Sequence, residues 1–304
     1  MTHAESQKDA ITAPSPREVG ATYDEFGPLF SLILGDSAIH VGSWSDPVDH
    51  VDGVGHDRPA EHTPVTTLIG LANRAMDRQT DRFIDLLRPR PGRRVLDIGC
   101  GTGGPAVRLA RSSGAHVTGV TVSRRQVSEA TELALAAGLI GKVSFDHADA
   151  MRLPYPDDSF DAALAVDSLC HMNDRPRALR EAFRVLRPGA RLLLTEFTTA
   201  GAPTREQLDV YHAVWATGPL VSPGEVLEMA QEAGFVAERV ENDTHNVAMT
   251  GELMRLLYND RHDEVLARFG SETTARLDIL MPDLCAFSSG NLGHHIFLLS
   301  KPAA

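Results

Sequence analysis

The sequence predicts an α/β protein with a seven-stranded, mostly parallel sheet, helices on both faces and a helical lid. Short apolar runs of strand length alternate with helical patterns along most of the chain, which is typical of parallel strands joined by helices. A glycine-rich turn follows the first run, and such sheets bind ligands at the carboxyl ends of their strands. The predicted strands span 94–98, 116–120, 143–147, 161–166, 191–197, 235–241 and 294–300.

Helical patterns precede and separate these strands. The first helix is expected to begin at residue 16 or 17 and to end between 31 and 34. A second is expected within 65–87, where apolar residues recur at helical spacing, and the acidic, turn-rich segment 43–63 between the two is predicted to be a loop. The helices expected between strands span 105–111, 123–137, 175–185 and 223–233.

These elements divide the chain into a core and additions to it. The additions are expected to enclose a substrate, because insertions at the carboxyl edge of a sheet can close over a bound ligand. The predicted parts are a disordered tail (1–17), an N-terminal helical cap (18–90), a ligand-binding core (91–245) with a rim insertion (198–222), a helical lid insertion (246–292) and the last strand (293–304).

Composition excludes several classes of function. The net charge is −12 over 304 residues, whereas nucleic-acid and polybasic membrane surfaces need clustered Lys and Arg. No apolar run approaches the ~20 residues of a membrane span. The three cysteines lie far apart, and the His and Asp residues within 49–62 lack a fixed spacing, so no metal site is expected. We therefore expect a cytoplasmic protein without nucleic-acid or membrane partners, its oligomeric state open, a homodimer included.

The most informative segment is the glycine-rich turn in RRVLDIGCGTGGPAVRLA (93–110). Gly99, Gly101 and Gly104 fit the dinucleotide pattern G-x-G-x-x-G, so the glycine spacing alone does not identify the ligand. Asp97 would repel a diphosphate but can accept hydrogen bonds from an ammonium. The acidic residue that NAD-binding proteins carry about 20 residues further on is also missing here. Both observations favour a nucleoside with an amino-acid tail over NAD.

With these features the chain resembles the class I S-adenosylmethionine-dependent methyltransferases. Asp149-Ala150 stands where that family contacts adenine, 155–172 resembles its fourth strand and active-site loop, and 186–197 resembles its fifth strand. The resemblance covers roughly residues 20–300 and is closest to the small-molecule group that includes the rebeccamycin sugar O-methyltransferase. Tocopherol and sterol C-methyltransferases and cyclopropane mycolic acid synthases are more distant relatives. The resemblance implies a Rossmann-like core and S-adenosylmethionine as the cofactor.

The resemblance also implies which residues contact this cofactor. Thr121 replaces the acid that usually binds the ribose, so Gln126 is expected to take that role, and Tyr23 is expected to reach the methionine carboxylate. Each assignment has a structural alternative that needs no ligand, such as a tight turn, a solvated helix residue or a packed aromatic ring. The implied cofactor-binding residues are Tyr23, Asp97, Gly99, Gly101, Thr121, Val122, Ser123, Gln126, Asp149, Ala150, Asp167 and His171.

The chemistry is expected to need a base only if the acceptor must lose a proton, as a hydroxyl does. His171 is the leading catalytic residue, because it follows the fourth strand and titrates near neutrality. The resembling sugar O-methyltransferases have a His-His pair here and an Asp on the fifth strand. In this chain Cys170 replaces the first His, and Glu196 stands at the Asp position. This predicts a pair in which His171 is the base and Glu196 orients it.

These features predict a methyltransferase acting on a small natural-product-like acceptor, with O-methylation favoured. C-methylation of a terpenoid and N-methylation of an amine are the nearest alternatives. An alternative of another class is a protein that binds S-adenosylmethionine without transferring its methyl group, either as a cyclase or as a ligand-binding protein.

Overall fold

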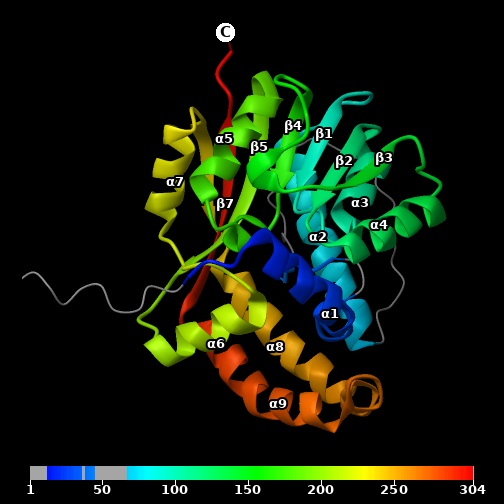
Figure 1. The fold of residues 1–304 in the computed structure, drawn as a ribbon, viewed down its shortest axis with the longest axis vertical. Coiled ribbons are helices and arrows are strands. Elements are labelled where there is room, and N and C mark those ends of the chain that lie inside the picture. The colour runs from blue at the N-terminus through cyan, green and yellow to red at the C-terminus, as the bar shows by residue number, and fades with distance from the viewer. Residues whose placement is uncertain (1–11, 36–37, 45–66, 304) are drawn as a thin grey trace, which may run out of the picture.

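The computed structural model describes residues 12–35, 38–44 and 67–303, and in them seven strands form one sheet. The strand order is β3-β2-β1-β4-β5-β7-β6, and only β7 runs antiparallel to its neighbours β5 and β6 (Figure 1). The sheet thus has the predicted mostly parallel form. The strands are β1 (Arg94–Ile98), β2 (His116–Thr121), β3 (Val143–His147), β4 (Phe160–Ala165), β5 (Leu186–Thr199), β6 (Val236–Asn242) and β7 (Leu292–Ser300).

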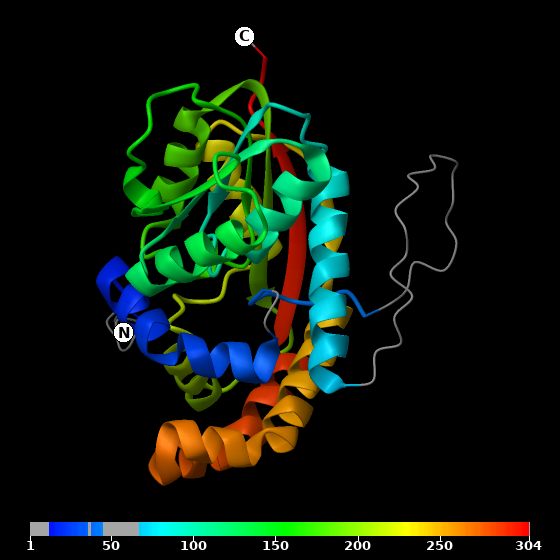
Figure 2. The same ribbon diagram turned by 90° about the vertical axis from the view of Figure 1, so that its right-hand side faces the viewer.

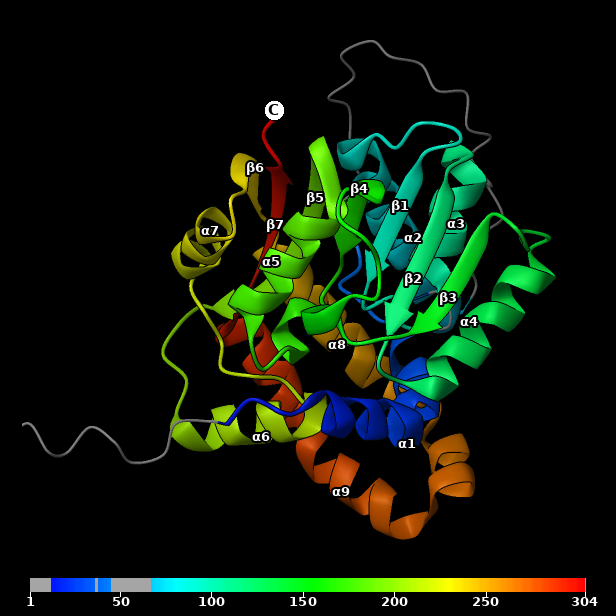
Figure 3. The same ribbon diagram turned by 45° about the horizontal axis from the view of Figure 1, so that its top comes forward.

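Strand alternation divides the core into two layers. In β1, Leu96 and Ile98 pack with α5 and α7 on one face, whereas Val95 packs with α2, α3 and α4 on the other. Amphipathic helices bury their apolar sides against each face, so both faces of the sheet are covered (Figure 3). The covering helices are α2 (Leu68–Leu87), α3 (Gly104–Ser113), α4 (Arg124–Ala136), α5 (Arg175–Val185) and α7 (Pro223–Glu232).

The remaining helices gather at one end of the sheet, where they form a lid (Figures 1 and 2). They share an apolar cluster that includes Phe30, Met254, Tyr258 and Met281. They are α1 (Pro16–Leu34), α6 (Arg205–Trp215), α8 (Thr244–Asp260) and α9 (His262–Gly290).

The predicted strands and helices are confirmed, with differences at their ends. β5 and β7 are longer than predicted. Their antiparallel pairing runs from Arg191↔Ser300 as far as Thr199↔Leu292, and β5 already begins at Leu186, which pairs with Phe160 of β4. The predicted tail 1–17 lies largely outside the described residues, and α1 begins at Pro16. The histidines and aspartates considered and rejected as a metal site, His50, His56, His62, Asp49, Asp52 and Asp57, also lie outside the described residues.

Helix α1 contacts the sheet closely enough to require a glycine. It begins with a capping box between Ser15 and Glu18. One turn later, a Cβ atom at Gly20 would lie 2.5 Å from the carbonyl oxygen of Val122, which follows β2. Asp24 then accepts hydrogen bonds from the Ser123 hydroxyl and the Arg125 amide at the start of α4. The helix is thereby fixed over the carboxyl end of β2.

We predict that Gly20→Ala lowers the free energy of unfolding by about 1–3 kcal/mol, because the added methyl group must push α1 away from a backbone carbonyl. Gly27→Ala is the matched control in the same helix. A Cβ there meets nothing within 4 Å, so this variant should gain up to about 1 kcal/mol from helix propensity. Urea denaturation measures both, and equal stabilisation by the two substitutions would contradict the close contact.

Candidate active site

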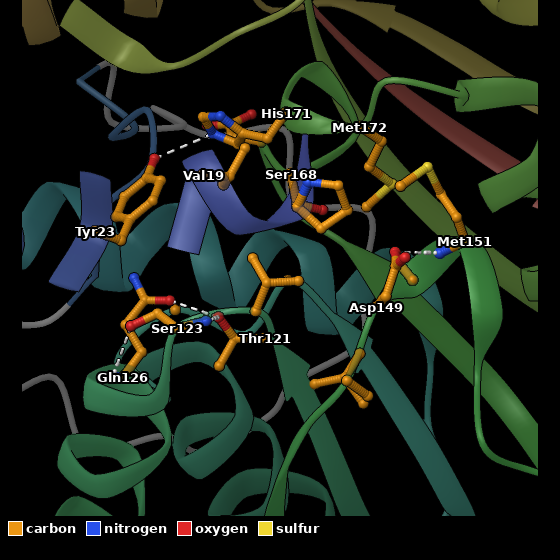
Figure 4. A pocket seen from close by; sticks show the side chains of 18 of the residues that line it. Val19, Tyr23, Thr121, Ser123, Gln126, Asp149, Met151, Ser168, His171 and Met172 are labelled. Carbon is orange, nitrogen blue, oxygen red and sulfur yellow. Dashed lines mark hydrogen bonds between the residues drawn. The ribbon is translucent and has the colours of Figure 1, made fainter. Parts of the chain in front are cut away.

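A cavity of about 760 Å³ opens at the carboxyl ends of β1, β2 and β4 (Figure 4). Every residue that the resemblance implies for cofactor binding lines this cavity, with the exception of Asp97. The strands explain this convergence, because the segments that follow parallel strands meet at one edge of the sheet. The remaining lining residues are Pro16, Val19, Ile39, Val120, Ala148, Met151, Val166, Ser168 and Met172.

The glycine-rich turn closes tightly on the end of β4. Gly99 has φ 79°, and a Cβ atom there would lie 2.4 Å from that of Ser168, so only glycine fits. The Ser168 hydroxyl donates a hydrogen bond to the Ile98 carbonyl at 2.6 Å. The two loops that follow β1 and β4 therefore form one rigid floor of the cavity.

Asp97 lies buried at the end of β1, next to this floor. Its Oδ2 atom has no hydrogen-bond partner, and burial raises the pKa of the carboxyl group to about 7. A buried, unpartnered carboxylate oxygen is costly unless a ligand supplies a donor. The position therefore fits a cationic or N–H-bearing group bound against the glycine-rich turn.

The opposite side of the cavity is polar and pre-arranged. Gln126 is buried, and its Oε1 atom accepts a hydrogen bond from the Thr121 hydroxyl at 2.6 Å, which leaves the amide nitrogen to donate to a ligand (Figure 4). Ser123 caps α4 by accepting from the Gln126 backbone amide at 3.0 Å. Asp149 accepts a hydrogen bond from the Met151 amide at 2.9 Å. Asp149 thus closes a turn, which is the structural alternative to a role in ligand binding, and it also lines the cavity.

A second cavity of about 660 Å³ adjoins the first beneath the lid helices. Four residues line both cavities and form what we call the shared wall: Tyr23, Ile39, Asp167 and His171. The second cavity is otherwise mostly apolar and aromatic. Its other lining residues are Leu34, His40, Val41, Cys170, Phe197, Tyr211, Trp215, Thr217, Val247, Thr250, Gly251, Met254, Ser288 and Leu292.

His171 has a defined orientation in the shared wall. Its Nδ1 atom lies 3.0 Å from the Ala216 carbonyl and its Nε2 atom lies 3.1 Å from the Tyr23 hydroxyl (Figure 4). A carbonyl only accepts, so the neutral ring carries its proton on Nδ1, and Nε2 accepts from Tyr23. Burial lowers the pKa of His171, and burial also raises that of Tyr23. The pair is thus a neutral base beside a protonated phenol.

The expected His171–Glu196 pair is not formed, which corrects the sequence-based expectation. Glu196 is fully buried, lines neither cavity, and its two carboxylate oxygens have no hydrogen-bond partner. Along β5 it shares a face with Leu194 and is therefore directed toward α5, where the Arg175 Nε atom lies 3.9 Å away. Burial raises the pKa of Glu196 to about 7, although Arg175 opposes this shift.

Arg175 connects Glu196 to the site indirectly. Its guanidinium donates hydrogen bonds to the carbonyls of Leu169 at 3.2 Å and Cys170 at 3.4 Å, and to that of Pro219 at 2.7 Å. These carbonyls belong to the loop that carries His171 and to the loop that follows Ala216. Glu196 is therefore connected to His171 only indirectly, through Arg175 and these loops.

Asp167 has a partner that the sequence did not indicate. Its Oδ1 atom accepts a hydrogen bond from the His294 Nε2 atom at 2.7 Å, and the His294 Nδ1 atom lies 3.2 Å from Asp243 Oδ2. Burial would raise the pKa of Asp167, yet His294 and Thr195 lower it to about 2. Burial would likewise lower the pKa of His294, yet the two carboxylates raise it to about 9. The three residues are distant in sequence, and no motif joins them.

Comparisons with known proteins agree with this geometry. A family model described as a methyltransferase domain matches residues 96–194. The chain is 37% identical over 235 residues to the 27-O-demethylrifamycin SV methyltransferase of Amycolatopsis mediterranei, covering 76% of this chain and 78% of that protein. It is 36% identical over 237 residues to an O-methyltransferase of Pyrenophora dematioidea, covering 77% and 82%. The crystal structure of the [4+2]-cyclase SpnF superposes with a TM-score of 0.76 at 31% identity, covering 97% of this chain and 100% of that one.

The chain therefore belongs to the class I S-adenosylmethionine-dependent methyltransferase family, as its sequence predicts. Among the described residues, none of the helices is long and apolar enough to span a membrane. The same residues contain no group of three or more His, Cys, Asp or Glu side chains suited to a metal ion.

We predict that Asp97→Asn stabilises the ligand-free protein above pH 7. The folded-state pKa of Asp97 is about 7 against 3.8 for the free group, so folding costs progressively more as the pH rises between these values. The variant should exceed the wild type by roughly 4 kcal/mol at pH 8 and match it near pH 4, measured by urea denaturation.

Asp161→Asn, on the neighbouring strand β4, is the control of opposite sign. Burial would raise the pKa of Asp161, but hydrogen bonds from Arg94 and Arg187 lower it, so its loss should destabilise the protein at pH 8. A difference between Asp97→Asn and the wild type that does not depend on pH would contradict the assignment.

Proposed function

We propose that the protein transfers a methyl group from S-adenosylmethionine to a hydroxyl group of a small, uncharged, largely apolar acceptor. The observation that supports this most directly is the shared wall: Tyr23, Ile39, Asp167 and His171 line both the first cavity, into which Gln126 and Asp149 also project, and the second cavity beneath the lid helices. Methyl transfer requires a donor and an acceptor held in line at short distance, and two adjoining cavities provide that arrangement.

The first cavity offers a partner for each polar group of S-adenosylmethionine. The unpartnered oxygen of Asp97 suits the ammonium, either directly or through the glycine-rich turn, and the free amide of Gln126 suits the ribose hydroxyls. Asp149 and Ala150 line the same cavity at the position for adenine. When bound, S-adenosylmethionine supplies a methyl group on a cationic sulfur. Asp167, the only carboxylate of the shared wall, is suited to lie near that charge.

The second cavity supports an uncharged acceptor. Its described lining includes no Lys or Arg that could bind a phosphate or carboxylate, and Asp167 is already paired with His294. Tyr211 is buried in this lining and its hydroxyl makes no hydrogen bond with the described protein, so it is available to an acceptor oxygen.

His171 is proposed as the base that removes the proton of the acceptor hydroxyl. Its lowered pKa keeps the ring neutral near pH 7, and the Ala216 carbonyl fixes the tautomer whose Nε2 atom can accept a proton. Tyr23 donates to the same Nε2 atom, so the acceptor hydroxyl either replaces the phenol there or donates its proton through it. Glu196 contributes by neutralising Arg175, which holds the loop of His171 in place.

A second candidate function is cyclisation of a substrate without methyl transfer. It is favoured by the likeness to SpnF, a [4+2]-cyclase, over 97% of this chain. C-methylation has less support, because Glu196 lines neither cavity and so cannot take a proton from a bound carbocation. N-methylation of an amine needs no base, which would leave the orientation of His171 unused.

We predict that the purified protein transfers deuterated methyl groups from S-adenosylmethionine to neutral, hydroxylated, natural-product-like acceptors, and not to phosphorylated or charged amine acceptors. Mass spectrometry of the products decides between the candidates. A methylated oxygen supports the proposal. A rearranged skeleton of unchanged mass supports cyclisation and would overturn it.

With any acceptor so identified, His171→Gln should lower turnover about 10²–10⁴-fold while the affinity for S-adenosylhomocysteine changes little. His262→Gln is the control, because His262 pairs with Asp278 far from both cavities. If His171→Gln turns over as fast as the wild type, His171 is not the base.

A further inference from the structure

A buried polar network lies behind the shared wall, and nothing in the proposed chemistry explains it. His294 and Asp243 are completely buried, and Asp167 is 8% exposed. Neither His294 nor Asp243 lines either cavity, so neither contacts a ligand directly. Burying two carboxylates and an imidazole has a large desolvation cost, which such groups recover only through close pairing. The cost of burying this network suggests that it has a function in the protein.

The pKa values of Asp167 and Asp243 are lowered in spite of burial, and with both carboxylates ionised the positions of the atoms call for a charged His294. Both ring nitrogens face carboxylate oxygens, Nε2 toward Asp167 at 2.7 Å and Nδ1 toward Asp243 at 3.2 Å. A neutral imidazole has a single N–H and can donate to one of them only, whereas the imidazolium donates to both. Other titratable groups nearby are Glu196, His40 and His295, while Arg82 pairs with Asp243.

The network reaches the N-terminal segment 38–44 at two points. Asp167 accepts a hydrogen bond from the Val41 amide at 3.1 Å. At the other end, Asp243 accepts from the Asn246 side chain at 3.0 Å, and Asn246 in turn accepts from the Trp44 amide at 2.9 Å. Segment 38–44 carries Ile39 of the shared wall, so its position determines how the two cavities meet.

We propose that His294 is a positioning residue for the methyl-transfer site: as an imidazolium between Asp167 and Asp243, it fastens segment 38–44 to the sheet and so holds the shared wall between cofactor and acceptor. The expected effect of His294 on the turnover of methyl transfer rests on the proposed function. Its effect on cofactor binding is separate, because Ile39 and Asp167 line the cofactor cavity itself.

The test compares His294→Asn with His295→Asn. His295 is the neighbouring residue, its Nδ1 atom lies 3.0 Å from the Thr198 hydroxyl, and it faces neither Asp167 nor Asp243. Calorimetry with S-adenosylhomocysteine should give at least a tenfold weaker Kd for His294→Asn and an unchanged Kd for His295→Asn. An unchanged Kd for both variants would overturn the proposal.

A double variant separates positioning from general stability. Asp243→Asn with His294→Asn removes one negative and one positive charge, so the melting temperature should recover part of the loss seen for His294→Asn. It should stay below that of the wild type, because Arg82 also loses its pairing with Asp243. The weakened binding of S-adenosylhomocysteine should remain, because Asp167 still lacks its cation. If binding and melting temperature recover together, His294 has a structural role only and the proposal fails.

The pH dependence provides a readout that a purely structural role would not give. The pKa of His294 is about 9, above the 6.5 of a free imidazole, so its contribution is complete below pH 6.5 and is lost as the pH rises through 9. The chain has two tryptophans, and in a Trp215→Phe background Trp44 alone reports on segment 38–44. Its emission should shift to longer wavelength through pH 9, and this shift should be absent when His294→Asn is added.

The outcomes distinguish this proposal from the proposed function. A wild-type protein that does not bind S-adenosylhomocysteine contradicts the proposed function, whatever the variants do. A wild type that binds it and methylates an acceptor, together with an equally active His294→Asn variant, contradicts only the role of His294.

Discussion

The site depends on the carboxylate of Asp167, at the end of β4. It accepts hydrogen bonds from the Val41 amide, the Thr195 hydroxyl and the His294 ring. Its backbone is left-handed, with φ 48°, a conformation that aspartate tolerates better than most residues. One side chain thus joins the N-terminal segment, β5 and β7 where the two cavities meet. Moving any of these elements changes the wall across which the methyl group must pass.

The fold follows from local patterns for a physical reason. Each parallel strand buries its residues alternately on the two faces of the sheet, and each helix covers one face. The apolar pattern of a segment therefore shows whether it is a strand of the sheet or a helix that covers it. Most of the first cavity is predictable for the same reason, because most of its residues lie at or just after the carboxyl ends of neighbouring strands, whereas Pro16, Val19, Tyr23 and Ile39 come from α1 and the segment after it. The ends of β5 and β7 are not predictable in this way. They continue to Thr199 and Leu292 because residues 191–199 of β5 pair with the full length of β7.

The charged groups of the site mark the limit of sequence reasoning. The type of residue at Glu196 suggests a partner for His171, but strand alternation turns it toward Arg175 instead. His294 has no local signal at all, because Asp167 and Asp243 lie 127 and 51 residues away in sequence. Which of several carboxylates meets which histidine is decided by tertiary packing, and a single sequence does not encode that pairing in a readable form.

The two histidines of the site differ in charge because their partners differ. Burial alone would make both neutral. His171 faces a carbonyl and a phenol, which orient its ring without compensating a full positive charge, so its pKa stays low and it can accept a proton. His294 faces two carboxylates and is held as a cation. Asp167 can therefore remain ionised in a buried wall because its counter-charge lies behind it, on the side away from both ligands. In the proposed function, His171 in front of it is left neutral, as the removal of a hydroxyl proton requires.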